Sequence, residues 1–215
     1  MVASATSRQA DSALDASPVS LPVVETFHSV QGEGAWVGTS AFFIRLAGCD
    51  VGCPWCDTQH SWNPTRHPLR TVDDLVAAAQ RAQPKIVVVT GGEPLMHNLD
   101  ALTRQLKQAG LRSHLETSGS HPFSGSFDWV TFSPKPFKPP HQSIYQRVSE
   151  LKVVVSKSED LEWAEVQAAR VPEEAVRMLQ PEWTTPGSTE LIFQYVLEHP
   201  KWRVSLQTHK YMNVR

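Results

Sequence analysis

Cysteine is scarce in this sequence: there are three, and all of them fall between positions 49 and 56. Disulfide-stabilised secreted domains use even numbers of cysteines spread along the chain, so this pattern argues against that class. Long apolar runs are also missing. The runs "IVVV" and "VVV" are far shorter than the roughly 20 residues that a membrane-spanning helix needs. We therefore expect a cytoplasmic protein with no membrane association.

An excess of positive charge is missing as well. Against 22 Asp and Glu stand 20 Lys and Arg, a formal net charge of -2. Binding to a phosphate backbone requires a positive field, so we expect no nucleic-acid partner. Residues 1–20 have no apolar core of the kind a secretory signal needs. We expect them to be a flexible extension, and residues 21–215 to form a single domain.

From Ala41 onward, β-branched and aromatic runs alternate with segments of helical period, which is typical of βα units. The predicted strands are 41–47, 85–90, 111–116, 127–133, 150–155, 176–180 and 202–207. The predicted amphipathic helices are 72–83, 99–109, 161–169 and 188–198. Several helices are missing between strands. The sequence therefore predicts an α/β fold, an incomplete, open (β/α) barrel of about six parallel strands.

Polar and special residues follow the predicted strands, in the segments "GCDVGCPWC", "TGGEP", "ETSG", "SPKP", "QP" and "QTHK". Parallel α/β folds place their active sites at the carboxyl ends of the strands. These segments are therefore predicted to converge on one cavity.

The spacing CxxxCxxC, on a loop that contains glycine, indicates a metal site. Thiolates suit both zinc and iron–sulfur clusters. His60 could complete a Cys₃His zinc site, so a non-enzymatic zinc-binding module is one alternative, and an inert group of buried cysteines is another. A four-iron cluster ordinarily uses four cysteines, so a set of three would leave one iron open to a small molecule.

This loop after the first barrel strand, followed by a strand that ends in "TGGEP", resembles the radical S-adenosylmethionine (radical SAM) superfamily. The resemblance implies that Cys49, Cys53 and Cys56 hold a 4Fe-4S cluster. It also implies that SAM binds the open iron through its amino and carboxylate groups. An electron from the cluster then produces a 5′-deoxyadenosyl radical, so that the cofactor supplies the difficult chemistry.

The segments "QGEG", "CDT", "ETSG", "SPK" and "QTHKY" further resemble the 7-carboxy-7-deazaguanine synthase family, from Glu25 to the last residue. This resemblance implies a carbon–nitrogen lyase of preQ₀ and queuosine biosynthesis. Such an enzyme contracts the ring of 6-carboxy-5,6,7,8-tetrahydropterin to give 7-carboxy-7-deazaguanine and ammonia, and it regenerates SAM. A radical SAM activase of another type remains an alternative, but it leaves "QTHKY" unexplained.

The same resemblance implies roles for individual residues. Arg45 suits a substrate carboxylate, the Gln31 amide suits a pterin edge, and Glu93 offers acceptors to the SAM ammonium group. Thr58 is the expected Mg²⁺ ligand, together with water and substrate oxygens. Substrate contacts are expected at Val30, Gln31, Gly32, Arg45, Thr117, His209 and Arg215. SAM contacts are expected at Trp55, Asp57, Gly92, Glu93, Gly119, Ser133, Pro134, Lys135, Gln180 and Pro181.

Two partners follow from the resemblance: a second copy of the chain in a homodimer, and an external one-electron donor of the flavodoxin or ferredoxin type. The segment "QPEWTTPGSTE" departs from the family pattern after "QP". The roles of Glu182 and Trp183 therefore stay open.

Overall fold

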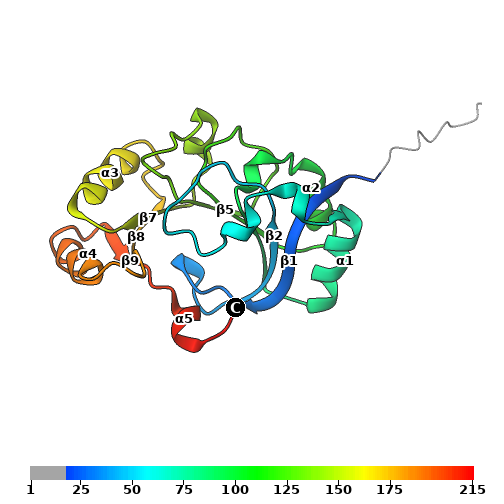
Figure 1. The fold of residues 1–215 in the computed structure, drawn as a ribbon, viewed down its shortest axis with the longest axis horizontal. Coiled ribbons are helices and arrows are strands. Elements are labelled where there is room, and N and C mark those ends of the chain that lie inside the picture. The colour runs from blue at the N-terminus through cyan, green and yellow to red at the C-terminus, as the bar shows by residue number, and fades with distance from the viewer. Residues whose placement is uncertain (1–17) are drawn as a thin grey trace, which may run out of the picture.

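A curved sheet organises residues 18–215, the part of the chain that this computed structural model describes. Its strands are β1 (Ser20–Val30), β2 (Ser40–Leu46), β3 (Leu69–Thr71), β4 (Ile86–Gly91), β5 (Ser113–Thr117), β6 (Trp129–Phe132), β7 (Glu150–Val155), β8 (Val176–Pro181) and β9 (Trp202–Val204). They lie in the order β3-β1-β2-β4-β5-β6-β7-β8-β9. The sheet curves into an arc whose two ends do not pair, so the barrel is open (Figure 1).

The strands from β2 to β9, apart from β3, run parallel to one another. This confirms the predicted open barrel of parallel strands, and all seven predicted strand segments form. The sequence did not predict β1 and β3, which pair antiparallel at one edge. In β1, Pro22 and several polar residues interrupt the apolar pattern, and β3 has only three residues.

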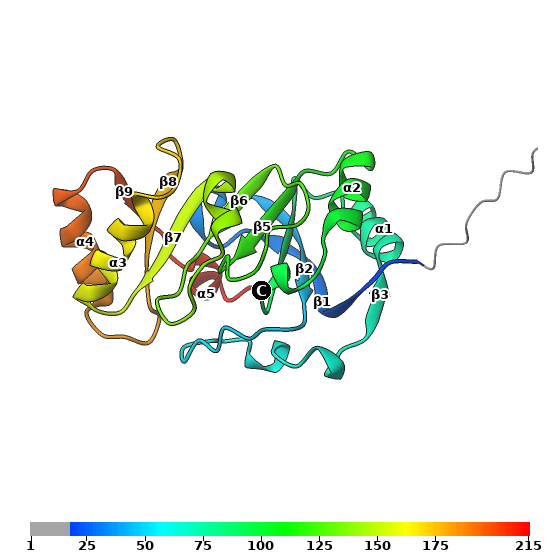
Figure 2. The same cartoon turned by 90° about the horizontal axis from the view of Figure 1, so that it is seen from above.

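Four helices cover the outer face of the arc: α1 (Val72–Ala82), α2 (Asp100–Gln108), α3 (Ser158–Ala168) and α4 (Ser188–Glu198). Their positions agree with the four predicted helices. α1 and α2 cover one end of the sheet, and α3 and α4 cover the other (Figure 2). No α-helix connects β5 to β6 or β6 to β7, and only a 3₁₀ segment, Gln142–Arg147, lies there. A short helix, α5 (Thr208–Met212), follows β9.

Strand alternation separates an apolar outer layer from a concave face that has a smaller apolar cluster, Ala41, Ile86 and Val88, and polar residues toward the strand ends. Val87, Val89 and Leu115 face the helices and belong to the main core. Residues of opposite parity, Thr90 on β4 and Glu116 on β5, line cavities on the concave side. Residues 47–68 cross in front of this face (Figure 1). The predicted convergence of strand ends is therefore produced by the fold.

The predicted N-terminal extension lies outside the described residues, except for 18–20. Of these, Ser20 is the first residue of β1 and pairs with Thr71 of β3. Among the described residues, no helix combines the length and the apolar character needed to cross a membrane.

Candidate active site

The three cysteines line one cavity at the carboxyl ends of the strands. Cys49 N donates to Trp62 O at 3.1 Å, which ties the start of their loop to the segment that follows it, and Cys56 N donates to Cys53 O at 3.2 Å in a turn within the loop. All three thiols are free and half-buried. Burial raises the pKa of the Cys49 and Cys53 thiols. A bound metal would favour the thiolates, because coordination competes with protons for sulfur.

The donor set fits a cluster better than a single ion. Within residues 18–215, no group of three or more His, Cys, Asp or Glu side chains converges as a single-ion site. His60 is exposed and does not line the cysteine cavity, so the Cys₃His zinc arrangement is not formed. Three sulfurs around a shared cavity suit the larger iron–sulfur cluster and leave one iron without a protein ligand.

Gly92 forms the wall behind the cysteine loop. A Cβ atom at this position would collide with the Gly48 carbonyl oxygen and would approach Cys49 Cβ to 3.0 Å. Glu93 N donates to the same Gly48 carbonyl at 2.7 Å. The loop and the end of β4 are therefore in backbone contact, and only glycine fits between them.

Glu93 is 1% exposed, and each of its carboxylate oxygens accepts two hydrogen bonds. Oε1 accepts from Leu95 N at 3.0 Å and from Thr117 Oγ1 at 2.5 Å. Oε2 accepts from Ser118 N at 2.8 Å and from Ser118 Oγ at 2.6 Å. The predicted contact with an ammonium group would therefore have to replace one of these donors. In this structure Glu93 joins the end of β4 to the "ETSG" turn.

We expect Glu93→Gln to lower the free energy of unfolding by about 2–3 kcal/mol, because an amide nitrogen would face backbone and hydroxyl donors that need an acceptor. Urea unfolding of the cluster-free protein measures this change. Glu190→Gln, on the exposed face of α4, is the matched control and should change it little. Equal stability of both variants would show that the four contacts contribute nothing.

Lys135 also lines the cysteine cavity. Its Nζ donates to Ser133 O at 2.5 Å and to Ser133 Oγ at 2.8 Å. Burial lowers the pKa of Lys135, although nearby Cys53 opposes the shift. Trp55 packs edge-on against Phe137, with ring centroids 5.7 Å apart. This arrangement supplies a cation and an aromatic surface beside the cysteine loop.

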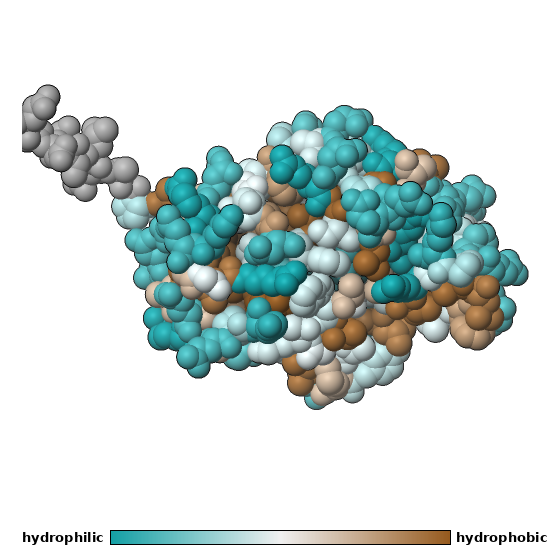
Figure 3. All heavy atoms as spheres, turned by 180° about the vertical axis from the view of Figure 1, so that it is seen from behind, coloured by the Kyte–Doolittle hydropathy of each residue, from teal (hydrophilic) through white to brown (hydrophobic). Residues whose placement is uncertain are grey.

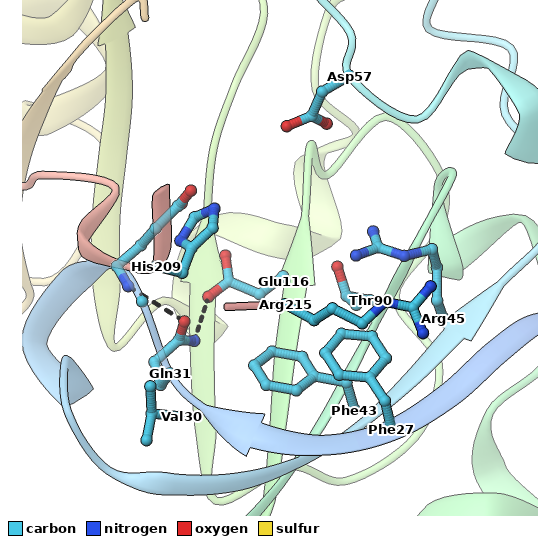
Figure 4. Close-up of a pocket in the computed structure, with 12 residues that line it drawn as sticks. Phe27, Val30, Gln31, Phe43, Arg45, Asp57, Thr90, Glu116, His209 and Arg215 are labelled. Atoms are coloured by element: carbon cyan, nitrogen blue, oxygen red, sulfur yellow. Dashed lines mark hydrogen bonds between the residues drawn. The ribbon is translucent and has the colours of Figure 1, made fainter. Parts of the chain in front are cut away.

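A second cavity adjoins the first and shares Glu33 and Glu116 with it. Figure 4 shows the rings of Phe27 and Phe43 and two guanidinium groups on one side, with Gln31 and Glu116 on the other. The two rings stack with centroids 4.8 Å apart and an 11° interplanar angle. The cavity thus offers an aromatic wall opposite a polar one.

The guanidinium groups are those of Arg45 and Arg215, and Glu25 pairs with both. Arg45 Nε lies 3.0 Å from Glu25 Oε1, and Arg215 Nη2 lies 2.7 Å from Glu25 Oε2. The two guanidinium groups share one carboxylate, so each keeps N–H donors that an anionic group of a ligand could use.

The polar wall contains a buried group of ionisable residues. We call Glu33, Glu116, Glu150 and Lys152 the acid–lysine cluster. Lys152 Nζ lies 2.6 Å from Glu33 Oε2 and 3.0 Å from Glu116 Oε2, and its side chain is 5% exposed. Burial acts against ionisation of Glu33, but Lys152 outweighs it and lowers the pKa of Glu33 to about 2. Burial raises the pKa of Glu116 to about 7, although Lys152 opposes it.

Most of the predicted site residues meet in these two cavities or at a connected mouth. Trp55 and Pro181 line the mouth, where Lys210 lies 3.7 Å from Asp57 and 4.9 Å from the centroid of Trp183. The cysteine cavity contains Thr58, Gly92, Glu93, Thr117, Ser133, Lys135 and Gln180. The second cavity contains Val30, Gln31, Gly32, Arg45, Asp57, His209 and Arg215.

Three predicted residues lie differently from what was expected. Gly119 and Pro134 line none of these three cavities. A Cβ atom on Gly119 would meet Phe132 and Ile144 of the core, so this glycine allows close packing of the turn. Thr117, expected at the substrate, lines the cysteine cavity and donates to Glu93.

Sequence reasoning missed Glu33, Glu116 and Lys152. Glu33 and Glu116 lie inside the segments "QGEG" and "ETSG", so their positions were marked although no role was given to them. Lys152 sits in the otherwise apolar segment "ELKVVV". A lysine in a buried strand requires a partner, and that was the available signal.

Comparison with known proteins places this geometry in context. A family model described as the radical SAM superfamily matches residues 43–133. The chain is 56% identical over 197 residues to a 7-carboxy-7-deazaguanine synthase from Synechocystis sp., covering 92% of this chain and 95% of the relative. A synthase of the same name from Flavobacterium psychrophilum is 48% identical over 195 residues, covering 90% and 92%. The crystal structure of QueE from Escherichia coli superimposes with a TM-score of 0.78 at 33% identity, covering 88% of this chain and 95% of that one.

Proposed function

The chain belongs to the 7-carboxy-7-deazaguanine synthase family of radical SAM enzymes, and from this premise we propose that it contracts the ring of 6-carboxy-5,6,7,8-tetrahydropterin with loss of ammonia, in preQ₀ and queuosine biosynthesis. The observation that carries the proposal is the pair of adjoining cavities that share Glu33 and Glu116. One cavity has the thiols for a cluster, and the other has an aromatic wall and two guanidinium groups.

The protein's own residues bind and orient in this proposal. Cys49, Cys53 and Cys56 would hold the 4Fe-4S cluster, and Gly92, which lines the same cavity and lets the cysteine loop pack against the end of β4, is a proposed SAM contact. When bound, the cluster and SAM supply a 5′-deoxyadenosyl radical. The remaining SAM contacts are proposed at Trp55, Asp57, Glu93, Ser133, Lys135, Gln180 and Pro181, with Gly119 and Pro134 acting through the shape of their turns.

The second cavity would take the pterin. Phe27 and Phe43 provide a flat apolar surface for its ring, and the Gln31 amide provides a donor and an acceptor for its edge. Arg45 would pair with the substrate carboxylate. The remaining contacts are proposed at Val30, Gly32, Thr117, His209 and Arg215.

We expect Arg45→Met to weaken binding of 6-carboxytetrahydropterin by about 100-fold, because a desolvated guanidinium–carboxylate pair contributes on the order of 2–5 kcal/mol. Calorimetric titration measures this effect. Tetrahydropterin without the carboxylate should bind wild type weakly and should not respond to the substitution. Arg45→Lys keeps the charge and should give an intermediate loss. If both pterins bind wild type equally, the carboxylate is not recognised and the proposed substrate is wrong.

Thr58 is the proposed Mg²⁺ ligand. It lines the cysteine cavity and the mouth, and its Oγ1 lies 3.6 Å from Cys56 Sγ. Mg²⁺ retains several waters, so a single protein oxygen can suffice when the substrate supplies others.

We expect Thr58→Ala to reduce the stimulation of product formation by Mg²⁺ several-fold, while the iron content stays that of wild type, because the variant removes one oxygen ligand and no sulfur. A Mg²⁺ titration of the anaerobic assay measures this. Thr189→Ala, at an exposed position of α4, is the control. An unchanged Mg²⁺ response would remove Thr58 from the metal site.

Three further features are proposed from family membership. The free cysteines suit the reducing cytoplasm. The cluster needs an external one-electron donor of the flavodoxin or ferredoxin type. A homodimer is supported by apolar side chains at one end of the molecule (Figure 3), where Phe193, Leu197, Val204 and Leu206 are exposed on and beside α4 and β9. Light scattering after gel filtration measures the oligomeric state.

A further inference from the structure

The acid–lysine cluster contains more carboxyl groups than its single ammonium can balance. Glu33 and Glu116 pair with Lys152, and Glu150 stands two residues before it on the same strand, β7. If all four groups were ionised, two excess negative charges would lie in the interior. Such burial costs several kcal/mol per ion, and proteins relieve it by retaining protons. At least one proton therefore belongs to this cluster near neutral pH.

Of the two carboxyls that contact Lys152, Glu116 is held by the longer hydrogen bonds. Glu33 accepts from Lys152 Nζ at 2.6 Å and from Gln207 Nε2 at 2.8 Å, so it is stabilised as the anion. Glu116 has a longer contact with Lys152, at 3.0 Å, and one with Gln31 Nε2, at 3.2 Å. Its raised pKa, about 7, agrees with a proton shared between the cluster and the cavity.

Glu116 is also the carboxyl best placed to exchange that proton with a ligand. It lines both cavities, and its side chain is 20% exposed, whereas Glu150 is 1% exposed and lies deeper, accepting from Trp129 Nε1. Glu93 is fully occupied by its four donors, and Asp57 has a side chain that is 64% exposed to solvent. The charged and titratable groups around the two cavities are Glu33, Arg45, Asp57, Glu93, Lys135, Glu150, Lys152, His209 and Arg215.

We propose that Glu116 donates the proton to the nitrogen that leaves the substrate as ammonia, and that Lys152 is the positioning residue that holds Glu116 for this transfer. The inference rests on the proposed function, which requires a carbon–nitrogen bond to break. An amide ion is too basic to leave, so nitrogen must receive a proton as the bond breaks.

The transfer balances within the cavity. The electron pair of the breaking carbon–nitrogen bond goes to nitrogen, which takes the Glu116 proton and departs as ammonia. The resulting Glu116 carboxylate takes a proton from a ring carbon, and the carbon–hydrogen electron pair forms the new ring double bond. Glu116 ends protonated, and the rearranged substrate has lost one molecule of ammonia.

The test compares Glu116→Gln with wild type and with the surface control Glu190→Gln, all reconstituted anaerobically. Because a positioned acid contributes 10²–10⁴-fold, we expect Glu116→Gln to lose at least about 100-fold in product formation while it keeps its iron content and its reductive cleavage of SAM. Infrared difference spectra over a pH series of the reconstituted protein should show a carboxyl band that titrates near pH 7. The band should persist in Glu190→Gln and vanish in Glu116→Gln.

The pH dependence of the product rate tests the positioning role of Lys152. The donating form is the acid, so the product rate of wild type should fall as pH rises through about 7. The ammonium lowers the pKa of Glu116, so Lys152→Met should move this fall to higher pH, and Lys152→Arg should restore it. If Lys152→Met does not fold, the pH profile of Lys152→Arg and the infrared titration of Glu116 test this role instead.

The outcomes separate the two proposals. If wild type forms no product, the proposed function fails, and this inference fails with it. If wild type forms product and Glu116→Gln does so within threefold, or if no Glu116 band titrates between about pH 6 and 8, only the present inference is overturned.

Discussion

Cys53→Ala is expected to abolish reductive cleavage of SAM and product formation together. The residue is one of three sulfur donors around the cavity, and no other cysteine exists in the chain to replace it. With two thiolates left, a four-iron cluster loses the support it needs. Iron and sulfide analysis, the visible spectrum, and 5′-deoxyadenosine formation should all fall to background.

The matched control is His60→Ala. His60 follows the cysteines in sequence, but it is exposed and lies outside their cavity. Iron content and SAM cleavage should therefore stay at wild-type values. If His60→Ala lost the metal as Cys53→Ala does, the site would be of the Cys₃His type and the cluster would be the wrong assignment.

The second large effect is expected from Gly92→Ala. The new methyl group would collide with the Gly48 carbonyl, a backbone atom that cannot rotate away, and would press on Cys49 Cβ. The cysteine loop must then move, or the end of β4 must. A displacement of about 1 Å in an active site can cost roughly 100-fold, so we expect a loss of SAM cleavage of about 100-fold or more.

Gly38→Ala separates this collision from the general cost of replacing a glycine. Gly38 has a φ of +81°, and a Cβ there would meet nothing within 4 Å. This variant should lose about 1–2 kcal/mol of stability from its left-handed backbone but no SAM cleavage. Equal losses of SAM cleavage in both variants would show that the close contact between Gly92 and the cysteine loop is not required for SAM cleavage.

The fold was predictable where apolar residues recur with the period of a strand or a helix. Apolar strands such as Ile86–Gly91 and amphipathic helices such as Val72–Ala82 carry a local period that a sequence displays. The strand ends were predictable as a meeting place because parallel strands share an edge. β1 was missed because Pro22 and several polar residues interrupt its apolar pattern, although it pairs with the next strand of the chain, β2.

The candidate site was predictable only where residues stand in a compact motif. The cysteines, Gly92 and Lys135 lie in short segments with special composition, and the structure brings them to one cavity. The acid–lysine cluster could not be predicted in this way: Glu33 and Glu116 stand in short motifs, but their ion pairs with Lys152 join positions 119 and 36 residues apart. Sequence spacing gives no information about such a contact.

Glu93 and Thr117 illustrate a second limit. Both were expected to face small molecules, and both do lie at the cysteine cavity, but they bond to each other at 2.5 Å. A polar residue at a strand end can serve the ligand or hold the turn that surrounds it. Only the geometry distinguishes these roles.

The most direct test of the account is the number of 7-carboxy-7-deazaguanine molecules formed for each SAM consumed. The reconstituted protein would receive 6-carboxytetrahydropterin, SAM, Mg²⁺ and dithionite under anaerobic conditions, and both compounds would be quantified by mass spectrometry. We predict many product molecules per SAM consumed, because the proposed reaction regenerates SAM. Steady cleavage of SAM with no 7-carboxy-7-deazaguanine would contradict the proposed substrate and leave only the radical SAM assignment.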